Sequence, residues 1–145
     1  MLYWNINEIL SYQRNFNFIN GPRSIGKTYT TLKHIIDNSI KRNKEFAYIV
    51  RTQDEKKNYI LKKACDKVIH NEFSSYDFKF THDKILINDT IIGLCIALSE
   101  AVKIKKEGFP NIYNIIFDEY TLEEKYSFQY INGWDEPELF LSIYH

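Results

Sequence analysis

The chain has 145 residues, of which 44% are hydrophobic, so it is long enough for one domain (1–145) with a substantial core. That hydrophobic content, with only three prolines, excludes an intrinsically disordered chain. Nineteen basic and nineteen acidic side chains give a formal net charge of zero. The net charge of the whole molecule therefore gives it no general attraction for polyanions.

The charges are unevenly distributed along the chain. From Lys41 to Lys67 there are nine basic and four acidic residues, a local excess of +5. From Glu107 to His145 there are eight acidic residues and one basic residue, a local excess of −7. Each segment is ordinarily a solvated face, but the pair also suits a subunit that packs head to tail on copies of itself.

The cysteines and the N-terminus argue against several classes of site and of protein. Cys65 and Cys95 lie far apart with no histidine at ligand spacing, so we predict two core thiols and neither a zinc site nor a disulfide. The N-terminus has no basic n-region, and no apolar run reaches membrane length. We therefore expect no membrane partner and a cytoplasmic compartment.

The first predicted elements surround a glycine-rich segment. A short apolar strand at Phe16–Ile19 precedes GPRSIGKT (Gly21–Thr28), which fits the pattern G-x-x-x-x-G-K-[ST]. Apolar residues then recur at helical spacing as far as Ile40, which predicts a helix beginning near Lys27. A turn that matches by chance is the alternative, but strand, loop and helix stand in the order that a phosphate-binding loop requires.

The residue types of this loop suit phosphate. Gly21 and Gly26 permit backbone conformations that let successive N–H groups point at phosphate oxygens, beside the positive end of the helix. Lys27 supplies an ammonium for the β- and γ-phosphates, and the Thr28 hydroxyl is placed for Mg²⁺. The predicted nucleotide-binding residues are Gly21, Pro22, Arg23, Ser24, Ile25, Gly26, Lys27, Thr28 and Tyr29.

The middle of the chain predicts a strand, a helix and a meander. FAYIV (Phe46–Val50) is an apolar run suited to a parallel sheet that is covered on both faces. A helix follows from about Asp54 as N-cap, with a buried stripe over 60–69 and lysines outside. Short β-rich runs over 76–98 suggest a three-stranded meander.

The last predicted strand carries a second motif. IYNIIFDEY (Ile112–Tyr120) is apolar and ends in Asp118 and Glu119. Such an ending is ordinarily a strand reaching solvent, but with a phosphate loop upstream it has the form of a Walker B element whose aspartate holds Mg²⁺. Glu119 is placed to orient a water at the γ-phosphate, which favours hydrolysis over transfer to a second substrate.

These elements predict an α/β fold with the site at the carboxyl ends of the strands. The expected architecture is an open, mostly parallel sheet with flanking helices and an inserted β-meander. A strand between the two motif strands suits the P-loop NTPases of the ASCE, RecA-like type, which have an inserted strand and a catalytic glutamate.

The ordered segments LSYQRNFNFINGPRSIGKTY, EFAYIVRT, the meander and FPNIYNIIFDEY resemble the genome-packaging motor ATPases of small protein-primed tailed phages. The resemblance covers most of the chain. It implies an ASCE-type ATPase core that uses ATP and Mg²⁺, and a ring of identical subunits on the portal of a procapsid, with packaging RNA or its equivalent. Double-stranded DNA would be driven into the procapsid in the host cytoplasm, by a virus-encoded protein.

Carried over by position, the resemblance gives Lys27 and Thr28 the phosphate and Mg²⁺ roles. Asp118 becomes the Walker B acid and Glu119 the catalytic acid. Arg23 matches a loop arginine that senses the γ-phosphate or a neighbouring subunit, and an ordinary surface arginine is the alternative. The predicted catalytic set is therefore Glu119, Lys27 and Arg23, with Thr28 and Asp118 on the metal.

Further positions follow from the resemblance with less support from the residues themselves. Arg51 would link nucleotide to DNA or to the adjacent subunit, and Lys56 would reach a neighbour's nucleotide; a solvated face is the alternative for both. Tyr12 and Gln13 stand where related motors contact the base, although SYQR equally suits a helix end.

The C-terminus departs from the family pattern. DEPELFLSIYH begins an apolar helical pattern and stops, and no arginine follows Arg51, so the usual arginine finger is absent. We expect an ATPase core that is truncated or completed by another component, and that binds ATP·Mg²⁺ but hydrolyses it weakly. The alternative function is a nucleotide-binding scaffold without significant turnover. A small-molecule kinase is disfavoured by Glu119 and by the lack of an arginine-rich lid.

Overall fold

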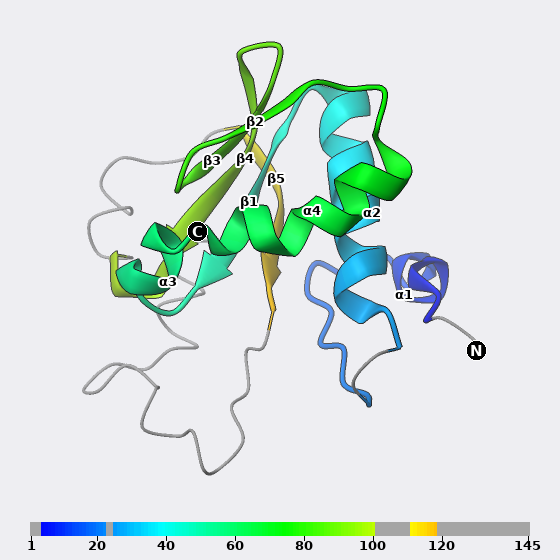
Figure 1. Cartoon of the computed structure of the whole chain (residues 1–145). Helices are drawn as coiled ribbons and strands as arrows, with labels where there is room; N and C mark the ends of the chain where they lie inside the picture. Colours follow the sequence, from blue (N-terminus) through cyan, green and yellow to red (C-terminus); the bar gives the residue numbers. More distant parts are fainter. Residues whose placement is uncertain (1–3, 23–24, 101–110, 119–145) are drawn as a thin grey trace.

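The computed structural model describes residues 4–22, 25–100 and 111–118 (Figure 1). Five strands form one sheet in the order β2-β3-β4-β1-β5. Along the chain these strands are β1 (Glu45–Val50), β2 (Phe78–Phe80), β3 (Lys84–Ile87), β4 (Thr90–Ala97) and β5 (Ile112–Phe117).

The sheet is mixed. β1 lies between β4 and β5 and is parallel to both, whereas β2, β3 and β4 pair antiparallel. The predicted α/β class and the meander are confirmed. For the described residues the prediction of a mostly parallel sheet is wrong, because the meander contributes as many antiparallel pairings as β1 contributes parallel ones.

The helix predicted after the glycine-rich loop is confirmed as α2 (Lys27–Arg42). Gly26 precedes it with a left-handed φ of 80°, and Asn43 ends it with a left-handed φ of 52°, which closes the C-terminus without a glycine. Leu32 and Ile36 are fully buried against the sheet. The 3.6-residue apolar spacing therefore places α2 directly on the strands.

The helix predicted from Asp54 is divided in two. Thr52, rather than Asp54, caps α3 (Gln53–Lys57) in a capping box with Glu55, and α4 (Ile60–Glu72) begins after Tyr59, whose φ is 57°. A left-handed residue cannot continue a helix, so the chain breaks there and changes direction. The predicted stripe is confirmed on α4, where Leu61, Cys65 and Val68 are buried.

The tight turn between β3 and β4 closes this hairpin of the meander without a glycine. Asn88 and Asp89 have φ values of 50° and 64°, so both central residues of the hairpin are left-handed. Such a turn matches the right-handed twist of the two strands, and Asn and Asp tolerate it better than other non-glycine residues.

The strand predicted at Phe16–Ile19 is not formed. These residues belong to no strand, and Phe16 and Phe18 are 39% and 74% exposed. In the described sheet β5 is an edge strand, so this segment does not pair with its open edge. Before it lies a short helix that the sequence analysis did not predict, α1 (Ile6–Ser11), which has no buried residue.

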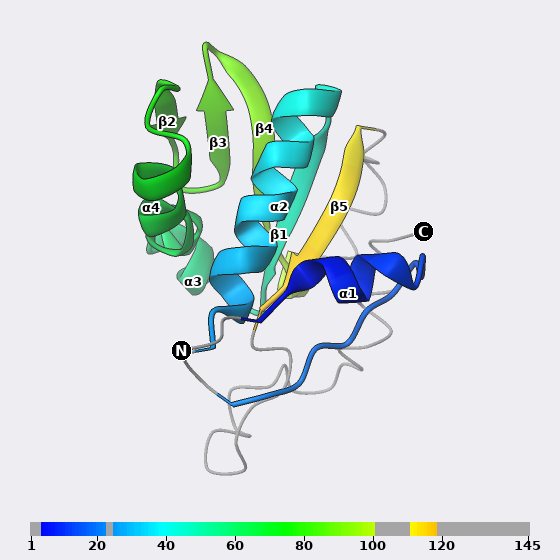
Figure 2. The ribbon, with the colours of Figure 1, turned by 90° about the vertical axis from the view of Figure 1, so that its right-hand side faces the viewer.

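The core consists of two clusters on opposite faces of the sheet. α2 and α4 cover one face (Figures 1 and 2), where the larger cluster includes Phe46, Tyr48 and Val50 of β1. The alternate residues Ala47 and Ile49 belong to the second cluster, to which only strands and the short 3-10 helix η1 (Leu98–Glu100) contribute within the described ranges. The predicted helical layer on this second face is not found in the described part of the chain.

Both cysteines are core residues, as predicted. Cys65 on α4 and Cys95 on β4 are 0% and 3% exposed, and neither forms a disulfide. Burial raises the pKa of each thiol to about 12, so both stay protonated at neutral pH. Within the described ranges, no helix combines the length and apolar character needed to cross a bilayer.

Candidate phosphate and metal site

The glycine-rich loop folds back on the first residue of α2. The Lys27 Nζ donates hydrogen bonds to the carbonyl oxygens of Gly21 and Pro22, both at 2.7 Å. A Cβ added to Gly21 would lie 3.3 Å from the Ile25 Cδ1, so the loop is packed closely at this point. The ammonium is thereby held at the loop, beside the N-terminus of a 16-residue helix.

One contact joins the two sequence motifs. The Thr28 hydroxyl donates a hydrogen bond to Asp118 Oδ2 at 2.9 Å, although the residues are 90 positions apart. Thr28 lies in the first turn of α2, and Asp118 directly follows β5. The predicted convergence of the loop and the acidic strand end is therefore found.

The oxygen atoms brought together here have the chemistry of a magnesium site. A hydroxyl and a carboxylate are hard oxygen ligands, and Mg²⁺ is usually bound by one or two protein groups together with waters and phosphate oxygens. Across the described residues there is no cluster of three or more His, Cys, Asp or Glu side chains that could hold a metal alone. The residues present fit a metal shared with a phosphate ligand.

Tyr29, predicted to contact nucleotide, has its hydroxyl directed elsewhere. It donates a 2.7 Å hydrogen bond to Glu72 at the end of α4, and Lys33 forms a 3.0 Å ion pair with the same carboxylate. These two bonds lower the pKa of Glu72. The Tyr29 side chain thus ties α2 to α4.

Arg51 and Lys56 are not on a freely solvated face. Arg51 is 5% exposed, and its guanidinium lies 5.1 Å from the centre of the Phe117 ring. Lys56 forms a 2.9 Å ion pair with Glu100, and each side chain is 17% exposed. The two basic residues therefore connect the segments that follow β1 and β4 with the last residue of β5.

The N-terminal segment touches the loop through its backbone. The Trp4 N–H donates to the Ile25 carbonyl oxygen at 3.0 Å. Tyr12 follows the last residue of α1 and is 58% exposed, and Gln13 has a left-handed φ of 51°. The helix-end interpretation of SYQR is thus confirmed, while the base-contact role of these two residues stays a prediction.

Three predicted site residues, Arg23, Ser24 and Glu119, lie outside the described residues. Sequence reasoning also missed two structural contributors near the site. The Thr52–Glu55 capping box was visible as the pattern T-x-x-E just after a strand. Glu100 had no comparable signal, because its partner Lys56 lies 44 positions away.

Comparison with known proteins gives the family. Residues 1–142 match the family model of the podovirus DNA encapsidation protein (Gp16). The DNA packaging protein of Bacillus phage B103 is 36% identical over 117 residues, which are 79% of this chain and 35% of that protein. The chain therefore spans about a third of the length of this curated relative.

Two solved structures from phage phi29 share the fold. One chain of the viral genome packaging motor assembly aligns with a TM-score of 0.83 and 29% identity, covering 99% of this chain and 42% of that one. The crystal structure of the N-terminal domain of the phi29 DNA packaging ATPase aligns with a TM-score of 0.80 and 28% identity, covering 99% of this chain and 71% of that one.

These names correct the family assignment made from the sequence, which was a motor ATPase family. The family model is that of a DNA encapsidation protein, and the curated relative is named a DNA packaging protein. Neither name assigns ATPase activity. By the family match and the identity to the B103 protein, the chain belongs to the podovirus DNA encapsidation protein (Gp16) family.

Proposed function

We propose that this phage DNA packaging protein binds ATP·Mg²⁺ at the Gly21–Thr28 loop and uses its hydrolysis to drive packaging. The observation that carries the proposal is the 2.9 Å hydrogen bond from Thr28 to Asp118, which unites the loop and the acidic strand end. We assign the fold, on the same ground, to the P-loop NTPases of the ASCE type. The phi29 domain that it resembles is named as part of a DNA packaging ATPase, which supports the assignment.

Each residue of the site has a separate task in this proposal. Lys27 exchanges its bonds to the Gly21 and Pro22 carbonyls for phosphate oxygens, so its charge is delivered where the anion binds. Thr28 and Asp118 hold Mg²⁺, which when bound neutralises charge on the phosphates. Glu119 orients the attacking water, and Arg23 senses the γ-phosphate.

The motor role is the wider part of the proposal. We propose a ring of identical subunits that acts on double-stranded DNA at the portal of a procapsid, with packaging RNA or its equivalent, in the host cytoplasm. The family name and the phi29 motor assembly among the similar structures support this setting.

Substitution Lys27→Ala tests nucleotide binding. We expect the affinity for ATP·Mg²⁺, measured by isothermal titration calorimetry, to fall by about tenfold or more, because charge-assisted bonds to phosphate are lost. Lys41→Ala is the matched control, since Lys41 lies on the same helix but pairs with Asp37. Unchanged affinity in Lys27→Ala would remove the basis of the proposal.

Substitution Glu119→Gln separates a hydrolysing enzyme from a nucleotide-binding scaffold. In a hydrolysing enzyme the variant retains bound ATP that the parent converts to ADP, because the water is no longer oriented. Chromatography of the bound nucleotide after single-turnover mixing gives the answer. Equal ATP retention by both proteins would identify an assembly module without turnover.

A further inference from the structure

Glu72, the last residue of α4, receives two contacts from α2. The Tyr29 hydroxyl donates a hydrogen bond to Glu72 Oε1 at 2.7 Å, and the Lys33 ammonium lies 3.0 Å from Glu72 Oε2. Tyr29 and Lys33 are four positions apart, so they lie on the same face of α2. Both oxygens of one carboxylate therefore attach the end of α4 to one side of α2.

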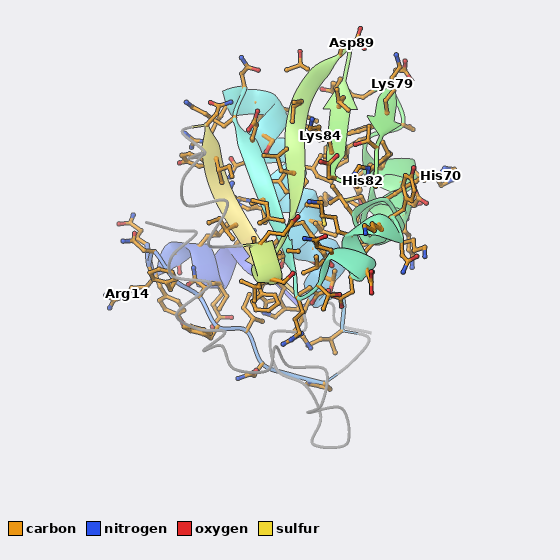
Figure 3. All side chains as sticks on the ribbon, turned by 90° about the vertical axis from the view of Figure 1, so that its left-hand side faces the viewer. Arg14, His70, Lys79, His82, Lys84 and Asp89 are labelled. Carbon is orange, nitrogen blue, oxygen red and sulfur yellow. The ribbon has the colours of Figure 1, made fainter. Side chains whose placement is uncertain are left out.

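The Glu72 side chain lies on the side of α4 that is turned toward α2. The end of α4 lies beside α2 (Figure 1). Figure 3 shows His70, two residues before Glu72, projecting outward from the molecule. Residues two positions apart on an α-helix are separated by about 200°, so Glu72 lies on the opposite side of α4 from His70.

The hydrogen bond from Tyr29 is the stronger of the two constraints. The Lys33 side chain is 50% exposed, so its ion pair is screened by solvent. A hydroxyl bonded to a carboxylate makes a charge-assisted contact instead. The Tyr29 ring also packs against the larger core cluster, which fixes the direction of its hydroxyl.

The first turn of α2 is thereby held in two directions. Thr28 donates to Asp118 after β5, and the next residue, Tyr29, donates to Glu72 on α4. Adjacent residues of a helix point about 100° apart, so the two bonds fix different sides of the turn. Lys27 is held separately, by the carbonyl oxygens of the loop.

Polar contacts in the second half of α2 are of another kind. Lys41 pairs with Asp37, and Asn38 bonds with His34 and with Arg42. These contacts join residues of the same helix, so they do not hold α2 against α4. The attachment through Glu72 belongs to the end of α2 that carries Thr28.

We infer that Tyr29 is a positioning residue of the metal site: its bond to Glu72 holds the first turn of α2 where the Thr28 hydroxyl can act as a ligand together with Asp118. The inference rests on the proposed function, in which Thr28 and Asp118 hold Mg²⁺. The bond between those two side chains is a weaker guide to the position of α2, because its oxygens are the ones that an ion would occupy. The bond from Tyr29 to Glu72 uses neither of them.

Substitution Tyr29→Phe tests the inference, because it keeps the ring and removes the hydroxyl. Calorimetry with and without Mg²⁺ gives the factor by which the ion enhances ATP binding. We expect this factor to fall by about three- to tenfold, the worth of one hydrogen bond. Metal-free ATP binding should stay within about twofold of the parent, because Lys27 is held by the loop.

Variants of Glu72 show whether Tyr29 acts through this carboxylate. Glu72→Ala should reproduce the effect, whereas Glu72→Gln should retain most of the enhancement, because its amide oxygen still accepts from Tyr29. The double variant Tyr29→Phe/Glu72→Ala should be no worse than either single one, since both remove the same bond. Tyr76→Phe is the matched control, because it removes the hydroxyl of an exposed ring near the same end of α4.

Hydrogen–deuterium exchange of the ligand-free protein gives a measurement that needs no nucleotide. In Tyr29→Phe we expect the amides of residues 30–34 to exchange about threefold faster or more, because the start of α2 has lost its attachment to α4. The amides of residues 38–42 should exchange as in the parent. Unchanged exchange over 30–34 would overturn the inference.

The outcomes separate this inference from the proposed function. If the parent does not bind ATP·Mg²⁺, both are overturned. If the parent binds and Tyr29→Phe keeps the full Mg²⁺ enhancement, the inference alone is overturned. If Tyr29→Phe loses affinity equally with and without Mg²⁺ while Glu72→Ala binds as the parent does, the Tyr29 hydroxyl contacts the nucleotide directly, which also overturns the inference.

Discussion

Thr28 and Asp118 are joined by one hydrogen bond between a hydroxyl and a carboxylate oxygen, at the junction of α2 and β5. The same two groups supply the metal ligands in the proposed function, so the bond fixes the ligands close together before any ion arrives. An aspartate in this position gives both an acceptor for Thr28 and a negative charge for a cation.

Asp118→Asn separates these two contributions. The amide oxygen still accepts from Thr28, so the fold is retained, but the charge that attracts Mg²⁺ is lost. We expect the enhancement of ATP binding by Mg²⁺ to disappear while metal-free binding persists, as measured by calorimetry with and without the ion. Asp89→Asn, in the exposed β3–β4 turn, is the control. A variant with unchanged Mg²⁺ dependence would contradict the assignment.

Among the elements, β4 carries a glycine for a packing reason. A Cβ added to Gly93 would lie 2.5 Å from the Ile85 Cγ2 and 2.6 Å from the Phe46 ring, which is closer than real Cβ contacts. Phe46 and Ile85 are both fully buried, so neither can move aside easily. Gly93 therefore allows β1, β3 and β4 to pack closely around one aromatic ring.

We expect Gly93→Ala to lower the free energy of unfolding by about 1–3 kcal/mol, because the added methyl overpacks this site. Urea denaturation followed by circular dichroism measures the change. Thr90→Ala, at an exposed position of the same strand, should stay within about 0.5 kcal/mol of the parent. Equal midpoints for parent and Gly93→Ala would show that the sheet relaxes around the methyl.

The contact between α2 and α4 makes the stability of the folded state depend on pH. Hydrogen bonds from Tyr29 and Lys33 lower the pKa of Glu72 below its usual value of 4.5. A carboxylate with a depressed folded-state pKa stabilises the native state above the unfolded pKa, and this contribution is lost as the pH falls through the folded pKa.

Glu72→Gln should therefore weaken the acid sensitivity of the fold. We expect the melting temperature of the parent to fall more steeply than that of the variant below about pH 4.5, because the variant has no carboxylate to protonate. Thermal scans across this range measure both slopes. Asp37→Asn, which removes an exposed pair on α2, is the control. Parallel slopes for parent and Glu72→Gln would contradict the assigned role.

Local patterns predicted α2 and β1 because each element is specified by its own spacing of apolar residues. The break at Tyr59 could not be predicted in this way, since a left-handed tyrosine leaves no signal in the spacing of apolar residues. The failed strand at Phe16–Ile19 has a related cause. Its apolar composition is suitable, but a strand forms only where the fold pairs it with another strand, which short sequence windows do not reveal.

The site was predictable to the extent that its groups belong to motifs. The loop and Asp118 were found because glycine, lysine, threonine and aspartate recur with fixed chemistry around phosphate. The Tyr29–Glu72 and Lys56–Glu100 contacts were not found, because each joins residues more than 40 positions apart. Long-range side-chain pairs depend on the completed fold.

At the scale of the whole molecule, burial within the described residues is concentrated on the inner strand β1. β1 is paired on both sides and five of its six residues are buried, whereas α1 has no buried residue. Local unfolding requires the least free energy where few apolar contacts are broken. β1 should therefore open only with the entire fold.

Hydrogen–deuterium exchange tests this expectation. We expect the amides of β1 to exchange last and those of α1 to exchange first, by mass spectrometry of peptic peptides, because opening β1 requires global unfolding. Peptides from the β3–β4 hairpin provide an intermediate reference. Protection of α1 equal to that of β1 would show that the N-terminal helix is part of the cooperative unit.

The backbone bond from Trp4 to Ile25 closes residues 4–25 into a ring of main chain that contains α1 and the first part of the Gly21–Thr28 loop. When the Ile25 carbonyl moves, either the bond breaks or the start of α1 follows it. The fluorescence of the Trp4 indole should therefore report, without any added label, a movement of this loop when an anion binds.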